Sequence, residues 1–245
     1  LPRCGAIAFL IWTVPIDLYE KGLTMTFTVT EWAGDWISFE RLIDSDDPYL
    51  ERAWREADAA MRANRSAFSI MLPFFGFSIR RFWRWACRTR SRDNRVPIAG
   101  WHIEPLVFGD QDGFALSWLS TDATVIATFA YHLDHMLAKG LEGKPCYVFR
   151  ADAAPADSPF RVLVSMDPMP ERAALADGGL ASHLHFQYAS SEDKLLKGTG
   201  EQAKLRNRMW YPTMCSAEGD LLAQCNIVRA LHKLPAWPSL PDLAS

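Results

Sequence analysis

The sequence lacks the cysteine spacings that mark thiolate metal sites and redox dithiols. Five cysteines occur in 245 residues, and they include no CxxC pair and no zinc-finger spacing. The odd number also argues against a complete disulfide framework. Cys215 and Cys225 flank a loop long enough to close one disulfide in an exported protein, whereas the composition favours reduced, partly buried thiols.

Neither sign of charge is in large excess, since the net charge is −3 and the isoelectric point is near 6.1. A nucleic-acid-binding protein normally carries a dense basic face, so we expect no nucleic-acid partner. One basic run, residues 80–95, interleaves arginine with phenylalanine and tryptophan, as segments that stack on bases or lie on membranes do. We prefer a simpler interpretation, in which arginine stems of an irregular helix or linker cover apolar surface.

Long apolar runs and common catalytic motifs are also missing. The apolar stretch CGAIAFLIWTVPI near the amino terminus is too short to span a bilayer, so we expect no stable membrane insertion. We expect residues 1–24 to lie outside the domain, which then occupies residues 25–245 with an irregular stretch at 64–95. A start at Met25 would give a cytoplasmic protein, and a leader at 1–24 an exported one. HExxH, GxSxG, P-loop and GxGxxG motifs are absent, which favours a non-enzymatic protein.

The hydrophobic pattern predicts helices first and strands afterwards. Apolar residues at spacings of three and four predict a short helix over residues 30–43, and Pro48 begins a second amphipathic helix. After Pro97 the chain changes to short strands separated by turns, and residues 217–234 predict a final helix. The strand-like runs are GWHIEPLVF, GFALSWLS, TVIATFAYHLD, KPCYVFRA, FRVLVSM and HLHFQYAS. We therefore predict a mainly β fold with α-helices, built on an antiparallel barrel.

A pair of histidines in the last of these runs predicts a metal site. On an extended strand His183 and His185 point to the same side, with Cα atoms about 6.5 to 7 Å apart, so both rings can reach one ion. Asp167, at the end of the preceding strand-like run, is the candidate third ligand. The alternative gives the histidines ordinary hydrogen bonds and makes Asp167 a turn residue before Pro168. HLDH, with His132 and Asp134 on one face, is a second source of ligands, whereas His102 and His232 look isolated.

Several runs resemble, in order, the ZinT/YodA family of zinc-binding, lipocalin-like proteins. TVTEWAGDWISFERLIDSDDPYLERAWREAD resembles the opening of that family, with its W-x-G-x-W segment before a helix. SHLHFQYASSEDKLL resembles its HxH strand, and MWYPTMCSAEGDLL its NWPTYYP segment. The likeness extends from about residue 30 to 232, without 64–94.

This resemblance implies a lipocalin- or calycin-like barrel with N-terminal helices and a C-terminal helix, and it implies zinc. His183 and His185 match two zinc-ligating histidines of the family. Asp167 stands where the family has a third, in an FSDH strand that aligns with VSMD. Aspartate can bind zinc, but the change could also lower affinity, favour harder cations or mark a lost site. The family's histidine-rich amino-terminal stretch is absent.

The residues leave several functions open. The first is a non-enzymatic divalent-metal-binding protein of the ZinT-like type, holding Zn²⁺ or another divalent cation through Asp167, His183 and His185. The alternative is a calycin-like barrel whose aromatic interior carries a small apolar ligand without metal. A barrel that only binds a protein partner is a third possibility, and the oligomeric state is open.

Overall fold

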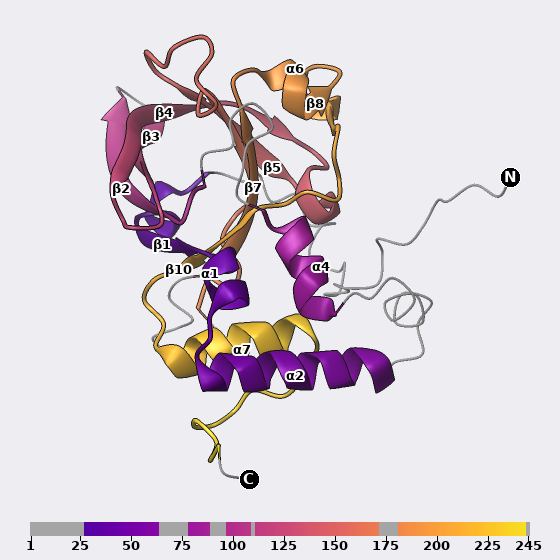
Figure 1. Ribbon diagram of the computed structural model, residues 1–245. Coiled ribbons are helices and arrows are strands. Elements are labelled where there is room, and N and C mark those ends of the chain that lie inside the picture. Colours follow the sequence, from indigo (N-terminus) through magenta and orange to yellow (C-terminus); the bar gives the residue numbers. More distant parts are fainter. Residues whose placement is uncertain (1–26, 64–77, 89–96, 109–110, 172–180, 244–245) are drawn as a thin grey trace, which may run out of the picture.

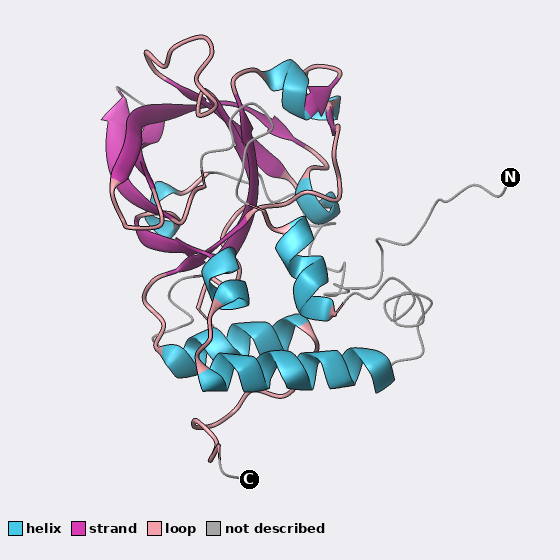
Figure 2. Ribbon diagram, viewed as in Figure 1, coloured by secondary structure: helices cyan, strands magenta, loops and turns pink. Residues whose placement is uncertain are grey.

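The computed structural model describes residues 27–63, 78–88, 97–108, 111–171 and 181–243 of the chain. It contains a closed antiparallel β-barrel that stands on a layer of helices (Figure 1). The predicted class is confirmed: the fold is mainly β with α, a lipocalin- or calycin-like barrel with helices near its amino-terminal end and one near its carboxyl-terminal end (Figure 2). The predicted leader, residues 1–24, lies outside the described residues, as does most of the irregular stretch at 64–95.

Eight described strands form the barrel, and every neighbouring pair is antiparallel. The strands are β1 (Gly34–Ser38), β2 (Gly100–Phe108), β3 (Gln111–Leu119), β4 (Val125–Leu137), β5 (Cys146–Ala151), β6 (Val162–Ser165), β7 (His183–Ala189) and β10 (Thr213–Ser216). Their order around the ring is β1-β10-β7-β6-β5-β4-β3-β2. β1 therefore closes the barrel, because it pairs with β2 on one side and β10 on the other.

The interior of the barrel is filled with aromatic side chains. As the alternation of apolar residues in β3 predicts, Phe114, Leu116 and Trp118 all face inward and are fully buried. Rings from the other strands and from the segment before β1 pack around them: Trp32, Trp36, Trp101, Tyr131, Tyr147, Phe149, Phe186 and Tyr188. Each of these side chains is at most 1% exposed, so the interior is a packed core.

One helix prediction was wrong in part. The helix predicted over residues 30–43 is a 3-10 turn, η2 (Val29–Glu31), followed by strand β1, and only α1 (Phe39–Asp44) is helical. The spacing of four between Trp32 and Trp36 imitates a helix, yet both rings enter the barrel interior. Gly34, with a φ of 103°, gives the backbone the conformation that separates the turn from the strand. Packing of the rings therefore decides the local structure.

Three more of the described helices, α2 (Pro48–Ala63), α4 (Ile79–Ala86) and α7 (Leu221–Leu231), form a second layer together with α1. The short helix α6 (Glu192–Leu195) lies apart from this layer, next to β8 (Figure 1). α2 and α7 lie side by side beneath the barrel (Figure 1). None of the helices in the described ranges has the length and apolar character that crossing a bilayer requires. Short elements complete the chain: η3 (Leu141–Gly143), β8 (Leu196–Lys197), η4 (Gly200–Gln202) and β9 (Lys204–Leu205).

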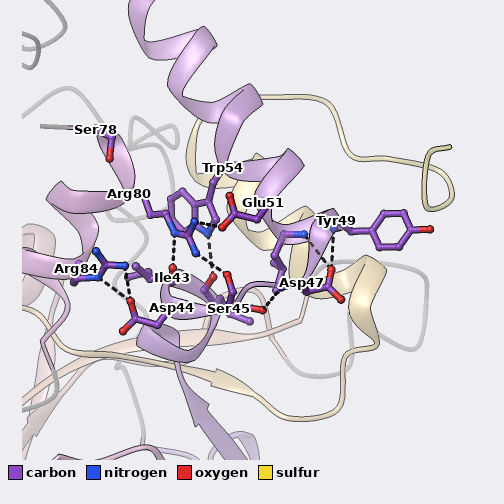
Figure 3. A network of polar contacts seen from close by, with 12 residues as sticks. Ile43, Asp44, Ser45, Asp47, Tyr49, Glu51, Trp54, Ser78, Arg80 and Arg84 are labelled. Atoms are coloured by element: carbon purple, nitrogen blue, oxygen red, sulfur yellow. Dashed lines mark hydrogen bonds and ion pairs between the residues drawn. The ribbon is translucent and has the colours of Figure 1, made fainter. Parts of the chain in front are cut away.

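Arg80 fastens α4 to the corner between α1 and α2. Its guanidinium donates to the carbonyl oxygens of Ile43 and Ser45 and to the carboxylate of Glu51 (Figure 3). Arg84, one turn later, pairs with Asp44 at 2.6 Å. Two arginines of the basic run thus bind the protein itself, which agrees with the simpler interpretation of that run.

Candidate functional site

The predicted histidine pair lies between the barrel wall and the helices. His183 and His185 share the outer face of β7, and their ring centroids are 5.6 Å apart. They line a small pocket with apolar side chains of the helical layer, namely Phe39, Trp83, Ile227 and Leu231. Across the ladder to β10, His183 lies opposite Cys215 and His185 opposite Thr213, whose hydroxyl is 2.8 Å from Nδ1 of His185.

The third predicted ligand lies elsewhere. Asp167 accepts a hydrogen bond of 3.0 Å from the hydroxyl of Tyr147, whose ring belongs to the barrel interior. Burial raises the pKa of Asp167, and the hydrogen bond from Tyr147 offsets only part of this effect. The histidines face the helices on the other side of the wall, so the structure does not bring Asp167 together with them. His183 and His185 therefore remain predicted metal ligands, but Asp167 is not placed to join them.

A second group of ligand-type side chains forms where β4 is irregular. Leu133 pairs with Phe149 and His135 pairs with Val148, which are neighbours in β5, so Asp134 is an extra residue in β4. Such a β-bulge re-aims the side chains around it. Consecutive residues of a regular strand point to opposite faces. Because of the bulge, Asp134 and His135 both turn toward the outer side, and a carboxylate and an imidazole meet.

Glu192, the first residue of α6, completes the group. One ligand atom of each of Asp134, His135 and Glu192 lies within 4.8 Å of the others. Nδ1 of His135 is 2.7 Å from Oδ2 of Asp134, and its Nε2 is 3.9 Å from Oε1 of Glu192. Arg150 of β5 binds the remaining oxygens, at 2.9 Å from Oδ1 of Asp134 and 2.5 Å from Oε2 of Glu192.

The charges and hydrogen bonds of the group single out Nε2 of His135 as the atom that could bind a cation. Burial of Asp134 opposes its ionisation, but hydrogen bonds from His135 and Arg150 outweigh burial and lower its pKa. Asp134 is therefore a carboxylate at neutral pH, and Nδ1 of His135 donates to it. In the neutral imidazole Nε2 then carries a lone pair, and this atom is buried with no hydrogen-bond partner among the described residues. Its neighbour is the Glu192 carboxylate, so a proton or another cation between them would relieve the repulsion.

This arrangement has the form of a carboxylate–histidine–metal relay. A metal-binding histidine usually donates its second ring nitrogen to a carboxylate, which fixes the tautomer and aims the first nitrogen. Here Asp134 would orient His135, and Nε2 and Oε1 would be the ligands. A cation about 2.1 Å from each, at a tetrahedral angle, holds two ligands about 3.4 Å apart, so the 3.9 Å gap would have to close by about 0.5 Å.

The HLDH segment contributes to this group, but through a different pair of residues from the predicted one. The pattern HLDH predicts His132 and Asp134 on one face, whereas His132 pairs with Asp152 at 2.8 Å and it is His135 that joins Asp134. A signal was present: from Ala127 to Leu133 the inward-facing residues occupy odd positions, and the next one, Met136, occupies an even position. This change of phase marks an extra residue. Nothing in the sequence near Glu192 indicates its part in the group.

Comparisons of the chain with protein-family models, with curated proteins and with solved structures gave no match. The resemblance to zinc-binding lipocalin-like proteins is thus supported at the level of the barrel.

Proposed function

We propose that this protein is a non-enzymatic divalent-metal-binding protein, with Zn²⁺ as the first cation to test, and that the ion binds between Nε2 of His135 and Oε1 of Glu192. The observation that carries the proposal is the buried Nε2 of His135, which has no hydrogen-bond partner among the described residues and lies 3.9 Å from Oε1 of Glu192. One imidazole and one carboxylate as ligands, with a second carboxylate that orients the imidazole, suit zinc and the harder divalent cations.

The alternative, a carrier of a small apolar ligand, has less support. Phe114 alone lies within ring contact of Phe27, Trp32, Tyr131 and Phe149, with centroids 5.0 to 6.0 Å apart. An apolar ligand would have to displace these rings. A metal on the outer face needs no space inside the barrel.

Elemental analysis of protein without a polyhistidine tag, loaded with Zn²⁺ and dialysed, tests the proposal. We expect about one equivalent of zinc in the native protein and in His132→Ala, which is the matched control from the same strand. His135→Ala and Glu192→Gln should lose the ion, and Asp134→Asn should bind about 10- to 100-fold more weakly, the usual effect of removing an orienting carboxylate.

The double variant His183→Ala/His185→Ala separates this group from the predicted pair. Zinc retained in the double variant supports the Asp134, His135 and Glu192 group. Zinc lost there, and retained in His135→Ala, would move the site to the histidine pair. No uptake by the native protein at any metal concentration would refute a metal-binding function.

A further inference from the structure

Helix α4 divides the basic run between two sides. Arg80 and Arg84 turn toward the corner between α1 and α2, where each pairs with a carboxylate (Figure 3). Side chains three and four residues apart share a helix face, so Arg81 and Trp85 point to solvent together, and Arg88 follows just beyond the last turn. The arginines that bind the protein itself are therefore not those that face solvent.

The segment before β10 lies against the last turn of α4. The backbone N–H of Tyr211 donates to the carbonyl oxygen of Ala86 at 3.1 Å, and the indole N–H of Trp210 donates to that of Arg88 at 2.8 Å. On the barrel side, the amide of Gln187 donates to the carbonyl oxygen of Trp210. The segment is thus held from two sides, and its position relative to α4 is fixed.

Exposed side chains of this segment extend the surface that α4 begins. Arg208 and Met209 come directly before Trp210 and are exposed. Met209 is 37% exposed and Trp85 is 50% exposed, which makes them two of the five large apolar side chains exposed among the described residues. Phe82 packs beside Trp85, with ring centroids 6.2 Å apart. Together these side chains form an aromatic–arginine surface, which consists of Arg81, Phe82, Trp85, Arg88, Arg208 and Met209.

The charge of the aromatic–arginine surface is opposite in sign to that of the whole chain. Its arginines are all positive, whereas the chain carries a net charge of −3. Arg88 and Arg208 take part in no ion pair within the ranges that the structure describes. A partner attracted here needs negative charge, and it also needs an apolar layer close behind that charge to receive Trp85 and Met209.

An anionic lipid bilayer has both properties in that order. Tryptophan prefers the boundary between headgroups and acyl chains, and arginine side chains reach from that depth to the lipid phosphates. Nucleic acid fits less well, because a few arginines neutralise few phosphates and Met209 offers no ring on which a base could stack. The 8 residues of α4 are too few to span a bilayer but suit contact with its surface.

We propose that the aromatic–arginine surface attaches the protein peripherally to membranes that carry anionic phospholipids. The arginines bind the headgroups, and Trp85 and Met209 enter the boundary beneath them. The attachment is reversible and weakens with salt, because the arginines supply most of the attraction. The inference goes beyond the proposed function, since no residue of the candidate metal site takes part.

Co-sedimentation with lipid vesicles, in low salt and with a chelator present, tests the attachment. The native protein should bind vesicles with about 30% phosphatidylserine, and it should bind phosphatidylcholine alone at least about tenfold more weakly. Arg88→Gln/Arg208→Gln should weaken binding about 25-fold, because each arginine near the charged surface contributes about fivefold. Trp85→Gln should weaken it about tenfold through the lost apolar contact.

Two matched variants carry the same kinds of change elsewhere. Arg161→Gln removes an exposed arginine between β5 and β6, and Val125→Gln removes an apolar side chain of β4 that is 58% exposed. Both should bind anionic vesicles within about twofold of the native protein, since neither belongs to the surface and distant exposed charges are screened.

Fluorescence quenching locates Trp85 in the bilayer. Vesicles with brominated acyl chains should quench the tryptophan emission of the native protein, whereas Trp85→Phe, which keeps a ring there, should bind similarly and lose most of the quenching. Equal binding by Trp85→Gln and the native protein, or no binding to anionic vesicles, would overturn the proposal. Binding to a single-stranded oligonucleotide in place of the vesicles would assign the surface to nucleic acid instead. None of these outcomes bears on the metal site.

Discussion

His232 shows how one buried side chain makes the protein sensitive to pH. Its Nδ1 lies 2.7 Å from the carbonyl oxygen of Val228 and donates to it, and its Nε2 accepts a hydrogen bond of 3.0 Å from the indole of Trp83. Both nitrogens are therefore satisfied in the neutral ring. Burial lowers the pKa of His232, against smaller opposing effects of Val228 and Asp58.

The free energy of unfolding should therefore fall as the pH is lowered from about 7.5 to 5.5. The unfolded chain takes up a proton near the ordinary histidine pKa of about 6.5, while the folded chain takes it up only at lower pH, so acid favours unfolding. In His232→Gln, which does not titrate, this dependence should flatten, at a cost of about 1 kcal/mol at pH 7.5. Urea denaturation at three pH values, followed by tryptophan fluorescence, measures both.

His102 supplies a control of opposite sign. Hydrogen bonding to Asp35, at 2.6 Å, raises the pKa of His102 despite some burial. Its contribution to stability is present at low pH and is lost as the pH rises through the raised value. His102→Gln should thus steepen the loss of stability in acid. If His232→Gln kept the slope of the native protein, His232 would not be the group responsible.

At the scale of the element, the extra residue in β4 is the feature that creates the candidate site. Its inward-facing neighbours, Leu133 and Met136, keep their places only because one residue between them is not paired regularly. Deleting Asp134 restores strict alternation from Ala127 to the end of the strand and leaves the remaining side chains there on their present faces. Deleting His132 instead would also remove the bulge, because the shortened strand could then pair regularly with β5. Leu133 would turn outward and Asp134 would turn inward.

We expect deletion of Asp134 to leave the midpoint of thermal unfolding near that of the native protein and to weaken zinc binding about 10- to 100-fold, as for Asp134→Asn. Deletion of His132 should lower the free energy of unfolding by several kcal/mol or prevent folding, because it buries an unpaired carboxylate among aromatic rings. Circular dichroism and elemental analysis of the two variants measure the difference. Equal damage by both deletions would show that β4 cannot be shortened here at all.

Individual elements were predictable to the extent that local patterning decides them. Pro48 and the acidic residues before it predicted α2, and the alternation of β3 predicted which side chains enter the barrel. β1 and β10 were not predicted: Trp36 imitates helical spacing, and Thr213–Ser216 is too short to show a period. The candidate site was not predicted, because it depends on a β-bulge and on Glu192, which is distant in sequence from Asp134 and His135 and meets them only in the folded chain.

At the scale of the molecule, the described apolar side chains form three clusters, and two of these cores lie on opposite sides of one barrel wall. Rings fill the barrel, and a second apolar cluster lies between the barrel and helices α1, α2, α4 and α7. This division explains the fate of the predicted ligands: Asp167 belongs with the first core and the histidine pair with the second. The sequence could not reveal this separation, because the alternation of side chains along a strand defines two faces without showing which face points into the barrel. The described cysteines are buried free thiols, so Cys215 and Cys225 form no disulfide.

The interior should respond to truncation as a packed core does. Phe114→Ala should lower the free energy of unfolding by about 3 to 5 kcal/mol, the usual cost of removing a buried phenylalanine ring. Val125→Ala, at a position that is 58% exposed, should change it by less than about 0.5 kcal/mol. Chemical denaturation of both variants measures the effects. A small loss for Phe114→Ala would point to spare space inside the barrel and would favour the apolar-ligand alternative.

The position of β1 between β2 and β10 also bears on how the protein is made. The ribosome releases Gly34–Ser38 early, but Thr213–Ser216 follows only after more than 170 further residues, on the order of 10 s later at ordinary translation rates. Until then the nascent sheet exposes unpaired backbone edges, which invite pairing with other chains. Newly synthesised molecules should consequently depend on chaperones during this interval more than their finished, edgeless form suggests.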